Sequence, residues 1–300
     1  MKSTTLDTRG SSSQLVQGTR RAMRPPRIGS IWLVLPGVVF LSVAFVVPLI
    51  ALLSQSVYHD GFTFRYFEQI LTTPGYRDVI WTSFKIALLS TAITIALAYP
   101  ISCYLTRVGP LTRSIMMALI VVPFWTNILA RCYAWIVILQ KGGLINTLLI
   151  RELGLISTPI DMLYNLPGVL IGMTHYVLPP AILILYSINH NIDVRLVGAA
   201  RSLGASPFRA FRYVYLPLSM PGVRAATLLV MILTLGFFVT PALLGGLSDV
   251  TLAMLIDTQF NETVNWNLGA ALATLLLLMT LLGIAVYYQA VAKATQARMQ

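Results

Sequence analysis

The stretch Ile31–Leu53 reads IWLVLPGVVFLSVAFVVPLIALL and contains no charged side chain. A helix of about 20 residues crosses the roughly 30 Å of hydrocarbon in a bilayer, so this stretch is long and apolar enough to span a membrane. It follows 30 mostly polar residues and is longer than the apolar core of a secretion signal. We therefore expect it to remain in the mature protein as a transmembrane helix.

Five further apolar stretches of similar length follow along the chain. Of the 300 residues, 57% are apolar and only 10% are charged, whereas about a quarter of the residues in a soluble domain are charged. This composition predicts an all-α integral membrane protein with six transmembrane helices. The five further stretches are Ile86–Leu105, Ile115–Leu139, Leu166–Ile188, Ala225–Leu244 and Leu268–Val291.

The distribution of Lys and Arg predicts how the chain crosses the membrane. With the N-terminus in the cytoplasm, the segments on the cytoplasmic side hold 15 basic residues and the outside loops hold four or five. Basic residues gather on the cytoplasmic side of membrane proteins, so we expect both termini to be cytoplasmic. The net charge of +11 then arises from these loops and indicates contact with a lipid membrane, not with nucleic acid.

The same patterns divide the chain into segments. Residues 1–30 are rich in Ser, Thr and Arg and are expected to form a disordered basic cytoplasmic tail. Residues 31–291 form the transmembrane domain, with a cytoplasmic loop at 189–222, and residues 292–300 form a second cytoplasmic tail. Apolar residues at helical spacing predict two short helices in outside loops, near Phe64–Leu71 and Leu144–Leu153.

The sequence shows no arrangement for catalysis or metal binding. The six predicted spans contain no Asp or Glu, and no phosphate-binding G-x-x-x-x-G-K-[ST] motif occurs. The three His residues are scattered, without the spacing of metal ligands. We therefore expect no catalytic residue, no metal and no cofactor. A proton-coupled carrier usually keeps a carboxylate within the membrane, so its absence indicates an energy source outside this chain.

One ionisable side chain, that of Arg131, lies inside a predicted span. An Arg in a membrane costs a few kcal/mol on insertion scales, so it needs a polar partner or water. Two interpretations are open. Arg131 lines or braces a pathway through the membrane, or its long side chain reaches the outer interface.

The predicted cytoplasmic loop begins with a helix signal. Asp193 is a favourable N-cap, and Gly204 fits the position just after a helix end. The small residues Ala199 and Ala200 between them would let another backbone approach closely. This helix is therefore expected to be a docking element for a cytoplasmic partner.

A second helix signal follows directly. Ser206 and Pro207 are typical of an N-cap and a first helical position, and Leu216–Pro217 is expected to end this second helix. The loop is thus predicted to hold two short helices joined by a sharp turn.

This loop resembles the docking motif of ABC importer permeases. That motif is E-A-A-x-x-x-G, followed after nine residues by I-x-L-P. Here Gly198–Gly204 reads GAARSLG, and nine residues later Val214–Pro217 reads VYLP. Gly198 replaces the Glu of the motif, which removes one charge from the docking helix. The resemblance implies that an ATP-binding subunit docks on Asp193, Leu196, Gly198, Ala199, Ala200, Leu203, Gly204 and Pro207.

Residues 30–290 further resemble one branch of these permeases, the spermidine/putrescine type. Matching stretches include Pro123–Asn127, Tyr133–Trp135, Gly142–Asn146 and Phe238–Gly246. The resemblance implies a type I importer permease in a bacterial inner membrane, with a polyamine or a related small organic solute as cargo. Aromatic faces attract cations, and the candidate pathway residues are Trp125, Asn127, Arg131, Tyr133, Trp135, Tyr176, Phe237 and Phe238.

The resemblance also implies a division of labour among subunits. This chain and a second homologous permease would form the pathway, two ATP-binding subunits would dock beneath them, and a periplasmic solute-binding protein would deliver the solute. The alternative is a secondary carrier or a channel that works alone. The cargo also stays open, because an Arg near the pathway favours an anionic group whereas aromatic faces favour a cation.

Overall fold

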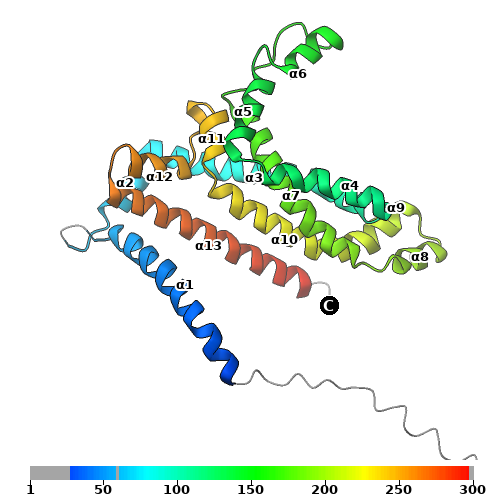
Figure 1. Cartoon of the computed structure of the whole chain (residues 1–300), viewed down its shortest axis with the longest axis horizontal. Helices are drawn as coiled ribbons and strands as arrows, with labels where there is room; N and C mark the ends of the chain where they lie inside the picture. The colour runs from blue at the N-terminus through cyan, green and yellow to red at the C-terminus, as the bar shows by residue number, and fades with distance from the viewer. Residues whose placement is uncertain (1–27, 59–60, 297–300) are drawn as a thin grey trace, which may run out of the picture. The chain divides into compact units, whose positions relative to one another are not determined.

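The computed structural model describes residues 28–58 and 61–296, which form helices and turns with no β-strand among them. The chain divides into two units, residues 1–51 and residues 52–300. Figure 1 labels the helices. In chain order they are α1 (Ile28–Gln55), α2 (Arg65–Thr72), α3 (Pro74–Leu105), α4 (Pro110–Val121), η1 (Val122–Trp125), α5 (Ile128–Leu139), α6 (Leu144–Thr147), η2 (Leu148–Glu152), α7 (Leu166–His190), α8 (Val194–Ser202), α9 (Pro207–Ala210), η3 (Phe211–Tyr215), α10 (Leu216–Leu235), α11 (Val239–Leu244), η4 (Leu247–Asp249), α12 (Leu252–Asn261) and α13 (Trp266–Gln296).

The first unit contains most of α1, whose apolar window Val34–Gln55 has a mean hydropathy of 2.6. Because α1 begins at Ile28, residues 28–30 are helical and not part of a disordered tail. The rest of that predicted tail, residues 1–27, lies outside the described residues. At the other end, α13 continues to Gln296 and so includes half of the predicted C-terminal tail, whose last four residues are not described.

Six helices among the described residues are long and apolar enough to cross a membrane, which confirms the predicted number. Four of them overlap the predicted first, second, fourth and sixth spans. The second begins earlier than predicted, at Pro74, because the polar residues before Ile86 continue the same helix. The third and fifth spans differ from the prediction in position and in continuity.

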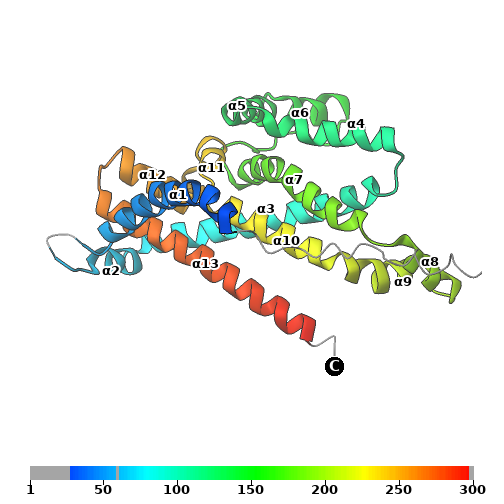
Figure 2. The same cartoon turned by 60° about the horizontal axis from the view of Figure 1, so that its bottom comes forward.

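The core of the second unit is formed by α3, α7 and α10, which pack against one another. Its buried side chains include Ala98 of α3, Val177 and Ala181 of α7, and Ala226 and Val230 of α10. Small and β-branched side chains allow helix backbones to approach closely, and such packing drives helix association in a membrane. Figures 1 and 2 both show α7 beside α10.

A second cluster joins α2, α12 and α13. It contains Ile70 of α2, Leu252 of α12, and Leu268 and Leu272 of α13. The helix predicted near Phe64–Leu71 is therefore present as α2, and Ile70 is the residue that anchors it.

The predicted third span, Ile115–Leu139, is not one helix. The chain leaves the helical conformation at Thr126 and Asn127, whose ψ angles are 147° and 136°, and restarts as α5. Pro123 lacks the N–H that would continue the hydrogen-bond ladder, and Asn127 caps the new helix by accepting from Leu129 N at 2.8 Å. The third helix long enough to span instead covers Ile128–Glu152.

The predicted fifth span, Ala225–Leu244, begins and ends too late. The helix already starts at Pro207 and runs through the π-helical turn η3 into α10, so Pro217 does not end it. Pro217 has no N–H to donate, but this is tolerated next to the π-helical turn, where the backbone hydrogen bonds already change from i→i−4 to i→i−5. The helix ends at Leu235, because Pro241 could not bond to Phe237 O in a continuous helix and instead occupies the first turn of α11.

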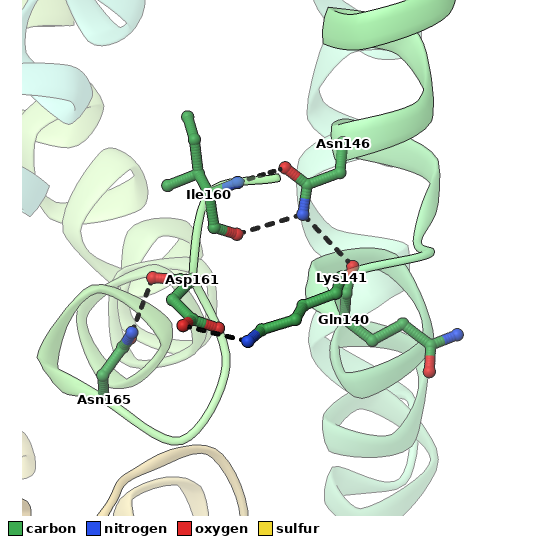
Figure 3. Close-up of polar contacts among 6 residues, drawn as sticks. All are labelled: Gln140, Lys141, Asn146, Ile160, Asp161 and Asn165. Atoms are coloured by element: carbon green, nitrogen blue, oxygen red, sulfur yellow. Dashed lines mark hydrogen bonds and ion pairs between the residues drawn. The ribbon is translucent and has the colours of Figure 1, made fainter. Parts of the chain in front are cut away.

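An arm formed by α5, α6 and η2 extends from this core (Figure 1). The predicted helix near Leu144–Leu153 is present there as α6 and η2, and Gly154 after it has φ +59°. Asn146 is completely buried. Its amide accepts from Ile160 N at 2.8 Å and donates to Ile160 O at 3.0 Å, as Figure 3 shows, so it fastens the loop before α7 to the arm.

We predict that Gly172→Ala destabilises the protein although alanine favours a helix more than glycine does. A Cβ at Gly172 of α7 would lie 2.5 Å from Leu244 Cδ1 and 2.6 Å from Thr240 Cγ2 on α11, so these two buried side chains, or the helices themselves, would have to shift. Overpacking of this kind costs about 1–3 kcal/mol. The measurement is the thermal unfolding midpoint of the purified protein.

The matched control is Gly283→Ala in α13, where a Cβ would meet nothing within 4 Å. That variant is expected to unfold at or slightly above the wild-type temperature. An equal response of the two variants would mean that the close approach of α7 and α11 does not constrain the fold.

Candidate translocation site and docking loop

Arg131, on the first turns of α5, turns back toward the break that precedes its own helix. Its side chain is only 8% exposed. Nη2 lies 2.6 Å from Pro123 O, 3.2 Å from Thr126 O and 3.1 Å from Thr126 Oγ1, and it also donates to Phe124 O at 3.3 Å. The guanidinium therefore supplies hydrogen bonds to Phe124 O and Thr126 O at the break, and it adds a further donor to Pro123 O, which also accepts from Thr126 N and Thr126 Oγ1. In this arrangement Arg131 contacts the break that precedes its own helix, which favours the interpretation that it braces the chain there.

An aromatic cluster lies beside the hydrogen bonds that Arg131 makes to the break. The ring of Tyr176, in the middle of α7, has the Arg131 guanidinium carbon 5.5 Å from its centroid. The Tyr176 ring also stacks on Phe237 at 4.4 Å between centroids and lies 6.1 Å from Phe124. Phe124 precedes the first break, and Phe237 belongs to the second break, between α10 and α11. Tyr176 thus connects the two interrupted helices.

Polar contacts extend the cluster along α5. The indole of Trp135 donates to His175 Nδ1 at 3.2 Å, and the two rings meet edge to face at 5.5 Å between centroids. Cys132, one turn earlier, lies 3.8 Å from Thr240 of α11 through its sulfur. The described residues contain no group of three or more His, Cys, Asp or Glu side chains that could hold a metal.

The structure brings together only some of the predicted pathway residues. Arg131, Tyr176 and Phe237 are in contact, and Trp135 joins the cluster through His175. Three others are exposed away from it, with exposed fractions of 83% for Trp125, 60% for Tyr133 and 41% for Phe238. Asn127 acts as the cap of α5.

Two members of the cluster, Phe124 and His175, were not predicted. Phe124 stands within the stretch Pro123–Asn127 that resembles polyamine permeases, and His175 is a polar residue inside an apolar span. Either feature could have singled them out. Their contacts, however, are made by segments far apart in the sequence, which spacing alone does not bring together.

The predicted docking helix is present as α8. Asp193 caps it by accepting from Arg195 N at 2.9 Å. At the other end Gly204 has φ +89°, its N–H bonds to Arg201 O at 3.0 Å, and the next N–H, of Ala205, bonds to Ala200 O at 3.1 Å. This pair of bonds is the Schellman arrangement, in which glycine accepts the left-handed conformation without strain.

The docking loop is shorter than predicted but more exposed than most of the bundle. It ends at Ser206, which caps α9 by accepting from Arg209 N at 3.3 Å, and residues 207–222 belong to the long helix instead. None of the nine residues of α8, all within the described part of the chain, is buried. Apolar side chains stand free on α8 and after it, with Leu196 49% and Leu203 89% exposed.

Buried polar contacts lie at the base of this loop. Asn189, at the end of α7, donates to Ser102 Oγ of α3 at 2.9 Å, and Tyr99 of α3 bonds to Ser219 of α10 at 2.8 Å. These bonds join the three core helices where the docking loop leaves the bundle. Figures 1 and 2 both place α8 and α9 at one end of the bundle and α2 and α12 at the other.

Comparison with known proteins identifies the family. Residues 98–296 match the family described as binding-protein-dependent transport system inner membrane component. The chain belongs to this family. It is a permease subunit of an ABC importer and crosses the bacterial inner membrane several times.

Several curated relatives cover most of the chain. PotB of Haemophilus influenzae, a spermidine/putrescine transport system permease protein, is 39% identical over 220 residues, which are 73% of this chain and 77% of that protein. PotB of Escherichia coli is 36% identical over the same share of this chain and 80% of its own length. YdcU of Escherichia coli, an inner membrane ABC transporter permease protein, is 28% identical over 241 residues, 73% of this chain and 76% of YdcU.

The fold also matches a solved importer. A chain of the bacterial alginate ABC transporter, crystallised in complex with its alginate pentasaccharide-bound periplasmic protein, superposes with a TM-score of 0.73. The match covers 86% of this chain and 92% of that chain at 14% sequence identity. At that identity the likeness concerns the fold, and it confirms the predicted permease architecture.

We predict that Arg131→Met lowers the thermal stability of the assembled importer, because Phe124 O and Thr126 O lose the side-chain donor that Arg131 provides, and a lost hydrogen bond to a charged donor costs about 1–3 kcal/mol. Arg131→Lys should lose less, since an ammonium can still reach one or two of the carbonyls. Arg151→Met, at an exposed Arg on the arm, is the matched control and should unfold as wild type. Wild-type stability of Arg131→Met combined with lost uptake would assign Arg131 to the pathway itself.

Proposed function

We propose that this permease subunit imports polyamines of the spermidine and putrescine class, driven by ATP hydrolysis on partner subunits docked at α8. The observation that carries the proposal is the 39% identity with a spermidine/putrescine permease over 73% of this chain. Three features of the described residues support it: the hydrogen bonds of Arg131 to the first break, the aromatic ring faces at the two helix breaks, and the exposed docking loop.

The first feature concerns the charge of the cargo. An Arg on the pathway would favour an anionic solute if its guanidinium were free. Here Nη2 of Arg131 is occupied by backbone carbonyls within 3.3 Å, and the side chain is nearly buried. Part of the guanidinium is therefore engaged with the break, although Nε has no hydrogen-bond partner among the described residues, and this weakens the sequence argument for an anionic solute.

The second feature is the presence of aromatic surface at two interrupted helices. Broken helices commonly form the solute site of transporters, because unwound backbone and ring faces are available there. Tyr176 and Phe237 lie between the breaks, and Trp125 and Tyr133 are exposed on the same segment as Arg131. Ring faces attract ammonium groups, and the exposed rings are available to line a pathway shared with a second permease chain.

The third feature is the docking loop. Its apolar residues Leu196 and Leu203 are exposed, and a Cβ on Gly198 would meet nothing within 4 Å, so the surface around Ala199 is open for a partner. The partner of this surface is an ATP-binding subunit, in two copies, with one docked on each permease chain. A periplasmic solute-binding protein delivers the polyamine from the other side. The predicted orientation, with both termini cytoplasmic, places α8 in the cytoplasm as this scheme requires.

The function is tested by reconstituting the importer, with its partner permease, ATP-binding subunits and solute-binding protein, in proteoliposomes. We expect ATP-dependent uptake of radiolabelled spermidine or putrescine and no uptake with a non-hydrolysable ATP analogue. Uptake by this chain alone, without the ATP-binding subunits, would support the alternative of a stand-alone carrier or channel. Uptake of other solutes but of no polyamine would contradict the proposed cargo.

For the docking loop, we predict that Ala199→Asp and Gly204→Val both release the ATP-binding subunit or uncouple it from transport. The Asp would bury an unpaired charge in the interface. Val at Gly204 would be strained, because φ there is +89° and a β-branched residue rarely adopts positive φ. The measurements are co-purification of the ATP-binding subunit and polyamine-stimulated ATP hydrolysis.

The matched control is Gly154→Val, at the other short helix that ends in a left-handed glycine, with φ +59°. It places the same strain in the arm formed by α5, α6 and η2, and it should retain the ATP-binding subunit. Normal coupling in both docking-loop variants would show that the subunit docks elsewhere.

A further inference from the structure

A cavity of about 540 Å³ lies between α10, α12 and α13 and is lined in part by Gly236 and Phe238 of the second helix break. Its size is within the range of small-molecule sites. Most of its lining is apolar, but one carboxylate and several polar groups face it. The residues important for the argument are Gly236, Phe238, Asp257, Phe260 and Asn261.

Asp257 supplies the carboxylate of this cavity. It is half-buried on α12, and its Oδ1 accepts a hydrogen bond from Asn261 Nδ2 at 2.7 Å. This bond, between residues one helical turn apart, orients the carboxylate. Among the described residues no Lys or Arg pairs with Asp257, and its Oδ2 has no hydrogen-bond donor. The carboxylate is thus positioned but has no counter-ion.

Two other carboxylates of the second unit, Asp161 and Asp249, are engaged by donors of this chain. Asp161 pairs with Lys141 at 3.2 Å on the exposed surface, as Figure 3 shows. Asp249 is buried and accepts from Gly246 N at 3.0 Å, which holds the turn after α11. Asp257 combines a cavity, an oriented carboxylate and a free oxygen.

The surroundings of Asp257 also favour a positive charge. The aromatic rings of Phe238 and Phe260 line the same cavity and can lie against an ammonium group. Gly236 ends α10, so the carbonyl end of that helix, with its partial negative charge, is also at the cavity. Three independent features, a carboxylate, ring faces and a helix C-terminus, therefore attract the same kind of ligand.

The break between α10 and α11 places this cavity next to the site already described. Phe237 stacks on Tyr176, whereas the next residue, Phe238, lines the Asp257 cavity. One short break therefore presents an aromatic ring to each of two neighbouring sites.

We propose that the Asp257 cavity binds one ammonium group of the polyamine, with the Asp257 carboxylate as its counter-ion and Phe238 and Phe260 against its methylene chain. This inference rests on the proposed function, since it assigns a place to that cargo. It also supplies the carboxylate that the six predicted spans lack, because α12 lies outside all of them.

The test is equilibrium binding of radiolabelled putrescine and spermidine to the assembled importer, without the solute-binding protein. The importer is held in nanodiscs of zwitterionic phosphatidylcholine, because an anionic lipid would itself bind the polycation, and the binding to protein-free nanodiscs is subtracted. We expect Asp257→Asn to weaken binding about tenfold or more, because it removes the charge of an ion-paired hydrogen bond. Asp257→Glu should restore most of the affinity. Phe238→Leu, which keeps an apolar side chain but removes the ring, should weaken binding several-fold.

The matched control is Glu262→Gln, which removes an exposed carboxylate just after α12 that does not line the cavity. It should bind as wild type. If Asp257→Asn and Phe238→Leu bind polyamine as tightly as wild type while the wild-type importer transports it, the cavity is not a cargo site, although the proposed function stands. A wild-type importer that neither binds nor transports polyamine contradicts the proposed function and, with it, this assignment.

Discussion

The bonds from the Arg131 guanidinium to the carbonyls of Pro123, Phe124 and Thr126 are the constraint on which the arrangement of the site depends. A chain that leaves the helical conformation next to a membrane span leaves backbone carbonyls without their helical donors. A charged side chain placed one turn after the break can satisfy them, and its own cost in the membrane is offset by the same bonds. The break and the arginine therefore require each other.

The second break, at Gly236–Phe238, is stabilised in a different way, without a charged side chain bonded to it among the described residues. The chain restarts at once as α11, and Pro241 stands in the first turn, where a missing N–H has no helical partner to lose. Packing then holds the two interrupted segments together, since Tyr176 contacts Phe124 at one break and Phe237 at the other. In a continuous helix the backbone hydrogen bonds set the relative position of consecutive segments. Here aromatic contacts with α7 set the relative position of the segments on either side of each break.

Much of the fold could be predicted, because hydropathy and capping are local properties. Length and composition predict six spans, and Asp193, Gly204 and Ser206 occupy the cap positions that their side chains or backbone freedom favour. The break in the third span was missed, because Thr126 and Asn127 lie within an apolar stretch that hydropathy averages over. Pro217 was mistaken for a helix end, because a π-helical turn before it depends on tertiary packing. The partners of Arg131 and Tyr176 come from three segments, and no spacing rule joins them.

The continuous helix from Pro207 to Leu235 connects the two functional regions. Its 29 residues rise 1.5 Å each, so it extends roughly 43 Å from the docking loop to the second break. Tyr99 and Ser219 bond across α3 and α10 near its middle, and Ala226 and Val230 pack in the core in its second half. In the proposed function, this helix would carry a displacement imposed at α8 toward Gly236. The break there allows the displacement to change the local geometry, and both Phe237 and Phe238 stand on it.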